Sequence, residues 1–239
     1  FFIWANSRLR QSRLREMTVQ GTVNKTGILL ALVVLSASYT WNIFFQSGNP
    51  GSVMPLAMGG ALVGFILALI TMFKRQWSGI TAPVYAIAEG LFLGGISAIF
   101  EAQYPGIVIQ AVGLTLGTLT SLLFLYKTGI IKPTENFRLM IVSATMGIGA
   151  LYLVSFLMNM FGSAGIGFIH SNGIFGIGFS LAVVAIAALN LVLDFDFIEQ
   201  GSEVGAPKYM EWFGAFSLMV TLIWLYIEIL RLLAKLRSR

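Results

Sequence analysis

Three acidic residues of this chain, Glu89, Asp194 and Asp196, lie within or at the end of stretches that are otherwise apolar. An ionised carboxylate in a lipid bilayer is energetically costly, so an acid in such a stretch is a candidate for binding or carrying an ion. Carboxylate oxygens are hard ligands of the kind that Ca²⁺ prefers. The three residues are therefore candidate ion-binding and pH-sensing groups, and Glu89 and Asp194 are the candidate calcium ligands.

Other polar residues accompany these acids or lie in the last apolar stretch. Asn190 precedes Asp194 by four residues, so both lie on one face of a helix, and the amide oxygen of Asn190 could support a bound cation. Glu228 and Arg231 are three residues apart, a spacing that predicts an ion pair within one helix. Glu101 is expected to be solvated.

The stretches that carry these residues are long enough to cross a membrane. Hydrophobic residues make up 57% of the chain, charged residues 10%, and the mean hydropathy is +0.84, a composition typical of integral membrane proteins. About 20 apolar residues in a helix span roughly 30 Å of hydrocarbon. Seven such segments are predicted, at residues 26–45, 53–73, 82–100, 107–126, 137–161, 174–197 and 209–233.

The predicted fold is an all-α integral membrane protein, a bundle of seven transmembrane helices within residues 26–239, preceded by a basic cytoplasmic amino-terminal arm, residues 1–25. Glycines spaced four apart, which let helix backbones approach closely in a membrane, predict tight packing of several spans. The pairs are Gly60 and Gly64, Gly90 and Gly94, and Gly113 and Gly117.

The basic residues predict the orientation of the chain. Lys and Arg occur before the first span and in the second, fourth and sixth connections, but not in the first, third and fifth. Because basic loops stay in the cytoplasm, the amino terminus is expected there, in a multi-pass protein of the cell (inner or plasma) membrane. Seven crossings would place the basic residues after residue 230 outside, contrary to this rule. The last segment therefore either crosses nevertheless or is re-entrant. Its length favours crossing.

The depth of the acids predicts that they meet. Glu89 lies about 10 Å from the cytoplasmic end of its span at 1.5 Å per residue, and Asp194 and Asp196 lie near the same end of theirs. The prediction is a common pocket. Asp194 and Asp196 are about 200° apart on a regular helix, however, so both face inward only if the helix ends there. The alternative is a helix terminus with acids in water.

Several classes of function are disfavoured. The chain has no Cys and a single His, His170, which is expected to be solvated, so thiolate chemistry and His-based metal sites are not expected. It has no Gly-x-Ser-x-Gly elbow and no phosphate-binding glycine loop, so neither an enzyme nor a cofactor is predicted. The basic residues flank the spans, which favours a lipid bilayer over nucleic acid as the partner.

Four segments in order resemble a known family. They are residues 89–94 (EGLFLG), 193–199 (LDFDFIE), 215–218 (AFSL) and 225–233 (LYIEILRLL). Together they resemble the Bax inhibitor-1 (transmembrane BAX inhibitor motif) family, in particular its bacterial branch, and the likeness extends from about Met17 onward.

The resemblance implies six helices around a central seventh and a pH-sensitive calcium leak governed by two aspartates near the cytoplasmic side. The helix-six aspartate matches Asp196, or Asp194 if the helix is shifted. The helix-seven position falls on Thr221, which is not acidic, and Glu89 is the best replacement. Ca²⁺ or protons would be the transported ions.

Two other functions remain open. A non-conducting membrane scaffold, or regulator of membrane protein quality control, would use the acids as interhelical hydrogen-bonding groups and the arm, Arg8 to Arg15, to contact a membrane protein partner. A proton-coupled transporter is the other, although no two spans show a convincing inverted repeat.

Overall fold

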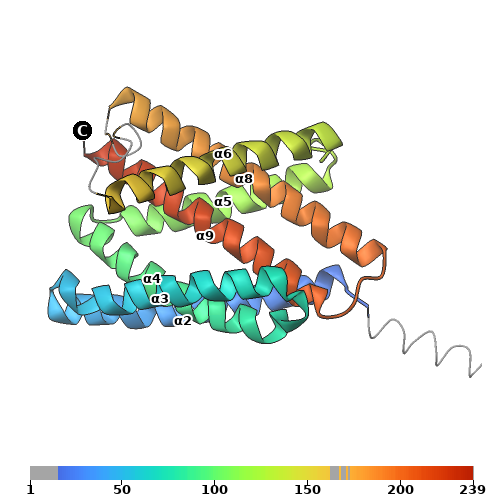
Figure 1. Ribbon diagram of the computed structural model, residues 1–239, viewed down its shortest axis with the longest axis horizontal. Helices are drawn as coiled ribbons and strands as arrows, with labels where there is room; N and C mark the ends of the chain where they lie inside the picture. The colour runs from blue at the N-terminus through green and yellow to red at the C-terminus, as the bar shows by residue number, and fades with distance from the viewer. Residues whose placement is uncertain (1–15, 162–166, 168–170, 172, 239) are drawn as a thin grey trace, which may run out of the picture. The chain divides into compact units, whose positions relative to one another are not determined.

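The computed structural model describes residues 16–161, 167, 171 and 173–238. The basic residues Arg8 to Arg15 and His170 lie outside this part of the chain. Within it, there are seven long helices and one 3₁₀ helix, η1 (Arg75–Trp77) (Figure 1). The long helices are α2 (Val19–Ser47), α3 (Pro50–Phe73), α4 (Ser78–Gln103), α5 (Ile107–Lys127), α6 (Glu135–Met160), α8 (Ile174–Glu203) and α9 (Met210–Arg237).

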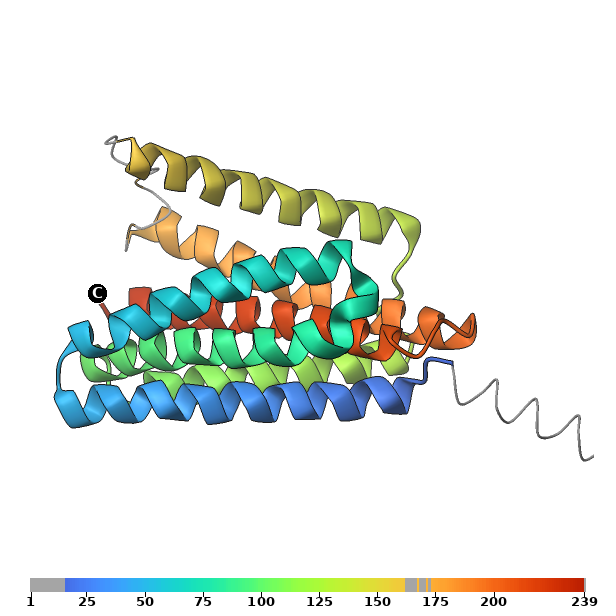
Figure 2. The same ribbon diagram turned by 60° about the horizontal axis from the view of Figure 1, so that its bottom comes forward.

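All seven helices are long and apolar enough to cross a membrane, which confirms the predicted fold class. The first helix begins earlier than predicted, at Val19 rather than residue 26, and runs as one straight helix (Figure 2). Its start is fixed by Thr18, whose side chain accepts a hydrogen bond of 3.0 Å from the backbone N–H of Gly21. Residues 19–25 of the predicted arm are therefore helical.

The last helix is the most buried of the seven. In its most apolar window 67% of α9 is buried, against 50% or less in each of the other helices. This burial agrees with the prediction that the carboxyl-terminal helix is central. α9 has 28 residues, about 42 Å at 1.5 Å per residue, which is ample for a full crossing.

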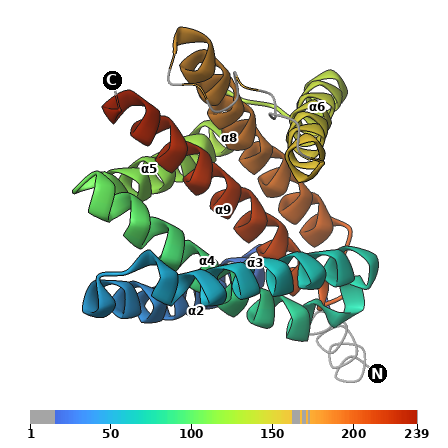
Figure 3. The ribbon, with the colours of Figure 1, turned by 60° about the vertical axis from the view of Figure 1, so that its left-hand side comes forward.

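The chain divides into two compact units. Unit 1 consists of residues 1–99 and 196–220, and unit 2 of residues 100–195 and 221–239. In unit 1, α2, α3 and α4 lie side by side (Figure 3). Their close approach depends on glycine, because a Cβ atom at Gly90 or Gly94 of α4 would collide with backbone of α2, and one at Gly60 of α3 with backbone of α4. The packing predicted for these glycines is confirmed.

Unit 2 is held together by contacts that join α8 and α9 to the other helices. The rings of Tyr126 in α5 and Phe195 in α8 lie 5.9 Å apart, and Asn190 of α8 donates a hydrogen bond of 2.8 Å to the Thr145 hydroxyl of α6. Unlike the glycines of unit 1, Gly113 of α5 has no atom within 4 Å of an added Cβ. The close packing predicted there was wrong.

Candidate functional site

Asp194 and Asp196 lie on α8 and are both buried, with 7% and 8% of their surface exposed. The helix does not end at these residues but continues to Glu203, so the expected alternative of a solvated helix terminus was wrong. Because the two acids point to different sides of the helix, α8 is covered on both sides at this level. One turn further on, Gln200 donates a hydrogen bond of 2.8 Å to Asp196 Oδ2.

Asn190 lies one turn before Asp194 and is anchored to two partners. Its Nδ2 donates to Thr145 Oγ1 at 2.8 Å and to the carbonyl of Ile186 at 2.9 Å. The amide nitrogen donates both bonds, and these bonds fix the orientation of the amide group. That Asn190 assists Asp194 stays a prediction.

Glu89 lies on α4 in unit 1 and is half-buried. Its carboxylate lies against Gly64 of α3, so closely that a Cβ at Gly64 would come within 2.5 Å of Glu89 Oε1. The glycine therefore makes the space that the carboxylate occupies. Asp194 belongs to unit 2, so the common pocket for these acids stays a prediction.

A complete metal centre is not formed among the described residues. No three Asp, Glu or His side chains in that part of the chain are grouped so that they could hold a metal ion. A cation held by Glu89 and Asp194 would thus need further oxygen ligands, because Ca²⁺ takes six to eight.

Glu228 and Arg231 form the ion pair that their spacing predicts, with Arg231 Nη1 2.9 Å from Glu228 Oε1. Glu228 is 2% exposed, and its Oε1 also accepts a hydrogen bond of 3.0 Å from the hydroxyl of Tyr152 in α6. Its other oxygen, Oε2, is buried and has no hydrogen-bond partner among the described residues. The pair is thus part of a buried network in which Glu228 Oε2 could accept a further hydrogen bond.

Glu101, which was expected to be solvated, instead accepts hydrogen bonds from the backbone N–H groups of Gly106 and Val108. Its charge is thus directed to the start of α5.

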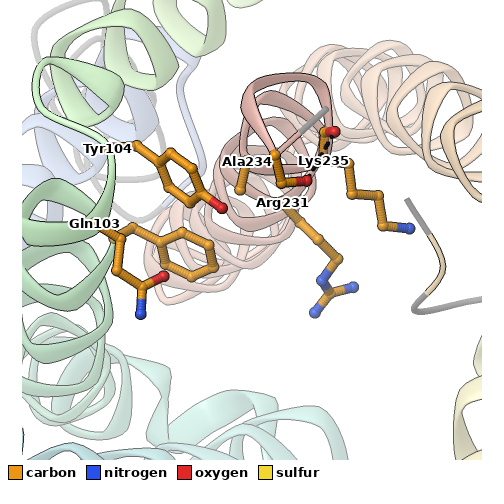
Figure 4. A pocket seen from close by; sticks show the side chains of 7 residues that line it. Gln103, Tyr104, Arg231, Ala234 and Lys235 are labelled. Carbon is orange, nitrogen blue, oxygen red and sulfur yellow. Dashed lines mark hydrogen bonds between the residues drawn. The ribbon is translucent and has the colours of Figure 1, made fainter. Parts of the chain in front are cut away.

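A pocket of about 220 Å³ lies in unit 2 beside the last turns of α9 (Figure 4). Its polar lining is Gln103, Tyr104, Arg231, Lys235 and Ser238. The sequence analysis treated Lys235 only as a signal of orientation. Its position four residues after Arg231, on the same helix face, is the signal that could have joined the two.

Sequence reasoning also missed Glu211, which is completely buried in the first turn of α9. Its carboxylate accepts hydrogen bonds from Thr18, through the backbone N–H at 2.9 Å and the hydroxyl at 2.7 Å. It also forms ion pairs with Lys25 and, at 2.8 Å, with Lys208. Glu211 thus ties the start of α2 to the start of α9 within unit 1.

The sequence matches the family model described as Bax inhibitor 1 like over residues 4–238. The chain belongs to the Bax inhibitor 1-like family. No curated protein and no solved structure gives a significant match. Family membership and seven membrane-length helices make the chain a multi-pass membrane protein of that family.

One position of this Bax inhibitor 1-like chain departs from the aspartate pair that the resemblance implied. The helix-seven position is Thr221, a half-buried residue of α9. The acids that α9 does carry in its described part are Glu211 and Glu228, and both lie in networks with basic residues. Thr221 has no carboxyl group, so the aspartate pair that the resemblance implied is incomplete at this position.

Proposed function

We propose that the protein is a slow, pH-sensitive calcium or cation leak channel, in which protonation of buried carboxylates gates the flow. The ions are its cargo, and neither a resident cofactor nor an enzymatic reaction is part of the proposal. The channel would lie in the cell (inner or plasma) membrane. Its amino terminus would lie in the cytoplasm, because basic residues occur before the first span and in every second connection.

The observation that supports this function is the burial of two carboxylates within one apolar helix. Asp194 and Asp196 are less than a tenth exposed, and they directly follow the apolar stretch of α8. Buried charges in such a helix are strongly destabilising unless they are paired, protonated or bound to a cation. A switch between a protonated and a cation-bound state would give these acids a function that offsets the cost.

The residues have different roles in this proposal. Asp194 and Glu89 are the proposed calcium ligands or titrating groups, and Asp196 lies nearer the cytoplasmic mouth. Asn190 supports Asp194, since it is held in place one turn away by Thr145. Hard oxygen ligands from carboxylate and amide groups suit Ca²⁺. Uptake of a proton by one carboxylate would remove a ligand and so change the ion affinity.

The test is calcium flux into proteoliposomes that hold purified protein and an internal calcium dye, at acidic and at neutral pH. We expect Asp194→Asn and Glu89→Gln to reduce the flux severalfold and to flatten its dependence on pH. Glu135→Gln is the matched control, because the substitution removes the same charge from a side chain that is 83% exposed. Wild-type flux in both site variants at both pH values would contradict the proposal.

The same assay separates the channel from its rival. A non-conducting scaffold, or regulator of membrane protein quality control, predicts flux no greater than that of empty liposomes for the wild type and all variants. In that case the buried acids would act as hydrogen-bonding groups between helices, and a membrane protein partner recovered with the wild-type chain should be lost on removal of residues 1–15.

A further inference from the structure

The connection between α3 and α4 presents basic and aromatic side chains together. Lys74 and Arg75 are exposed there, and they lie between Phe73 and Trp77, whose surfaces are 82% and 58% exposed. These four residues are called the α3–α4 cluster. The sequence has no acidic residue from position 17 to position 88, so no neighbour in the sequence offsets the two positive charges.

Two buried hydrogen-bonding residues hold this connection in place. Thr71 Oγ1 donates to Thr81 Oγ1 at 2.7 Å, which joins the last turn of α3 to the first turn of α4. Ser78 Oγ donates to the carbonyl of Tyr209 at 3.0 Å, just before α9. Thr71 and Ser78 are completely buried. The α3–α4 cluster therefore lies on a fixed turn, so a ligand that binds there does not have to order the backbone first.

Arg75 is held against an aromatic ring of another helix in the same unit. Its Cζ lies 5.0 Å from the centroid of the Phe213 ring in α9. A cation–π contact of this kind positions the guanidinium group without using its N–H donors, of which it has five. With the described residues, the Arg75 side chain forms no hydrogen bond and no ion pair. Its donors are thus positioned and open to a ligand.

Lys74 differs in the same way from other lysines of unit 1. Lys25 and Lys208 both form ion pairs with Glu211. The Lys74 ammonium group, in contrast, has neither a hydrogen bond nor an ion pair within the part of the chain that the structure describes. Lys74 and Arg75 therefore present two adjacent positive charges to the outside of the molecule.

The α3–α4 cluster lies between two consecutive membrane-length helices, Pro50–Phe73 and Arg75–Gln103. Such a short connection lies at the level of the lipid headgroups, where aromatic rings are favoured and basic side chains meet phosphate groups. A role in orienting the chain also requires positive charge at this level. It does not require the contact between Arg75 and Phe213, however, so orientation alone leaves that contact unexplained.

We propose that the α3–α4 cluster binds the headgroup of an anionic phospholipid. Arg75 and Lys74 contact the phosphate oxygens, for which a guanidinium group offers paired donors and an ammonium group a point charge. Phe73 and Trp77 lie beside the first part of the acyl chains. The site is independent of the proposed calcium leak, since it uses none of the three acids assigned to that leak.

The test is native mass spectrometry of the purified full chain in a mild detergent that contains equal amounts of phosphatidylglycerol and phosphatidylcholine. We expect the wild type to retain phosphatidylglycerol selectively. Arg75→Gln should lower the retained amount about tenfold, as loss of a charged hydrogen bond does, and Lys74→Gln about threefold. Lys132→Gln, at an exposed lysine in the α5–α6 connection, removes the same charge and should have no effect.

Arg75→Lys separates a defined site from a general effect of charge. It keeps the positive charge but removes the forked guanidinium group, so the retained phosphatidylglycerol should fall about threefold. Full retention in Arg75→Lys would show that charge alone matters and would overturn the site. Equal retention of the two lipids by the wild type, or an equal loss in Lys132→Gln and Arg75→Gln, would overturn it as well.

Discussion

The two units each bury one glutamate of α9, but they satisfy it differently. In unit 1, Glu211 accepts two hydrogen bonds from Thr18 and pairs with Lys25 and Lys208. In unit 2, Glu228 has Tyr152 and Arg231 on one oxygen, and the other oxygen has no hydrogen-bond partner within the described ranges. The first acid therefore joins two helices, whereas the second has one oxygen that could still accept a hydrogen bond from a water molecule or a ligand.

The position of each acid along the helix explains part of this difference. Glu211 lies in the first turn of α9, where the helix dipole favours a negative charge and where residues of the preceding loop can reach it. Glu228 lies 17 residues later (228 minus 211), about 25 Å along the axis, among apolar side chains. There, its partners must come from neighbouring helices or from its own.

The packing of glycines also differs between the two units. Gly90 and Gly94 of α4 in unit 1 lie directly on the backbone of α2, whereas Gly113 of α5 in unit 2 faces open space. Side chains of α6 are likewise little covered, with 11% of its apolar window buried against 50% for the α4 segment. The close fit of α2, α3 and α4 is thus confined to their glycine contacts, because α2, α3 and α5 each bury the same 22% of their apolar window.

The largest expected effect is that of Glu211→Gln. The change leaves Lys25, which is 17% exposed, without its ionic partner, and the loss of a buried pair costs about 3 kcal/mol. Unfolding in detergent should therefore occur at a clearly lower midpoint. Lys208→Gln is the control, since this lysine is 48% exposed and its pair should contribute less than about 1 kcal/mol. Equal midpoints for wild type and Glu211→Gln would contradict the structural role.

The next effect compares glycines of the two units. Gly94→Ala places a methyl group against the backbone of α2 and should destabilise unit 1 by about 2 kcal/mol, within the usual range for overpacking. Gly113→Ala meets nothing within 4 Å and should leave stability unchanged or raise it slightly, because alanine favours the helix. The measurement is the unfolding midpoint of both variants in the same detergent. A larger loss in Gly113→Ala would show that the assigned packing of α4 is wrong.

Glu228→Gln should have a smaller effect than Glu211→Gln. Glutamine can keep the hydrogen bonds to Tyr152 and Arg231, and only one cation, 35% exposed, loses its charge partner. We expect a loss of about 1 kcal/mol, again from the unfolding midpoint. If the loss equals or exceeds that of Glu211→Gln, then Glu228 Oε2 has a partner that completes the network, and the two units do not differ in the way described.

The sequence predicts contacts within a helix better than contacts between helices. The Glu228–Arg231 pair follows from the helical repeat alone, and the seven spans follow from length and hydropathy. The partners of Glu211 do not, because Lys25 lies 186 residues away in the chain. Lys235 and Ser180, which form a hydrogen bond of 2.8 Å, are 55 residues apart. Such pairs depend on which helix faces which, and neither hydropathy nor local spacing contains that information.

The candidate site shows the same limit. Burial of Asp194 and Asp196 on one continuous helix was not expected, because their spacing places them on different sides of it. Whether such a pair is buried depends on what covers each side of α8, which a single apolar stretch does not reveal. Glu89 was singled out by depth alone, and the structure adds the glycine, Gly64, that makes room for its carboxylate.

The smallest expected effect on stability concerns the support of Asp194 in unit 2. Thr145→Val removes the acceptor of the 2.8 Å bond from Asn190, which keeps its bond to the Ile186 carbonyl. A single interhelical hydrogen bond in a membrane protein is worth about 0.6 kcal/mol, so the unfolding midpoint should hardly change. Calcium flux should nevertheless fall if Asn190 assists a cation at Asp194, because the amide would lose its fixed orientation. Thr145→Ser, which keeps the hydroxyl, should restore it; flux that follows neither substitution would separate Asn190 from the ion path.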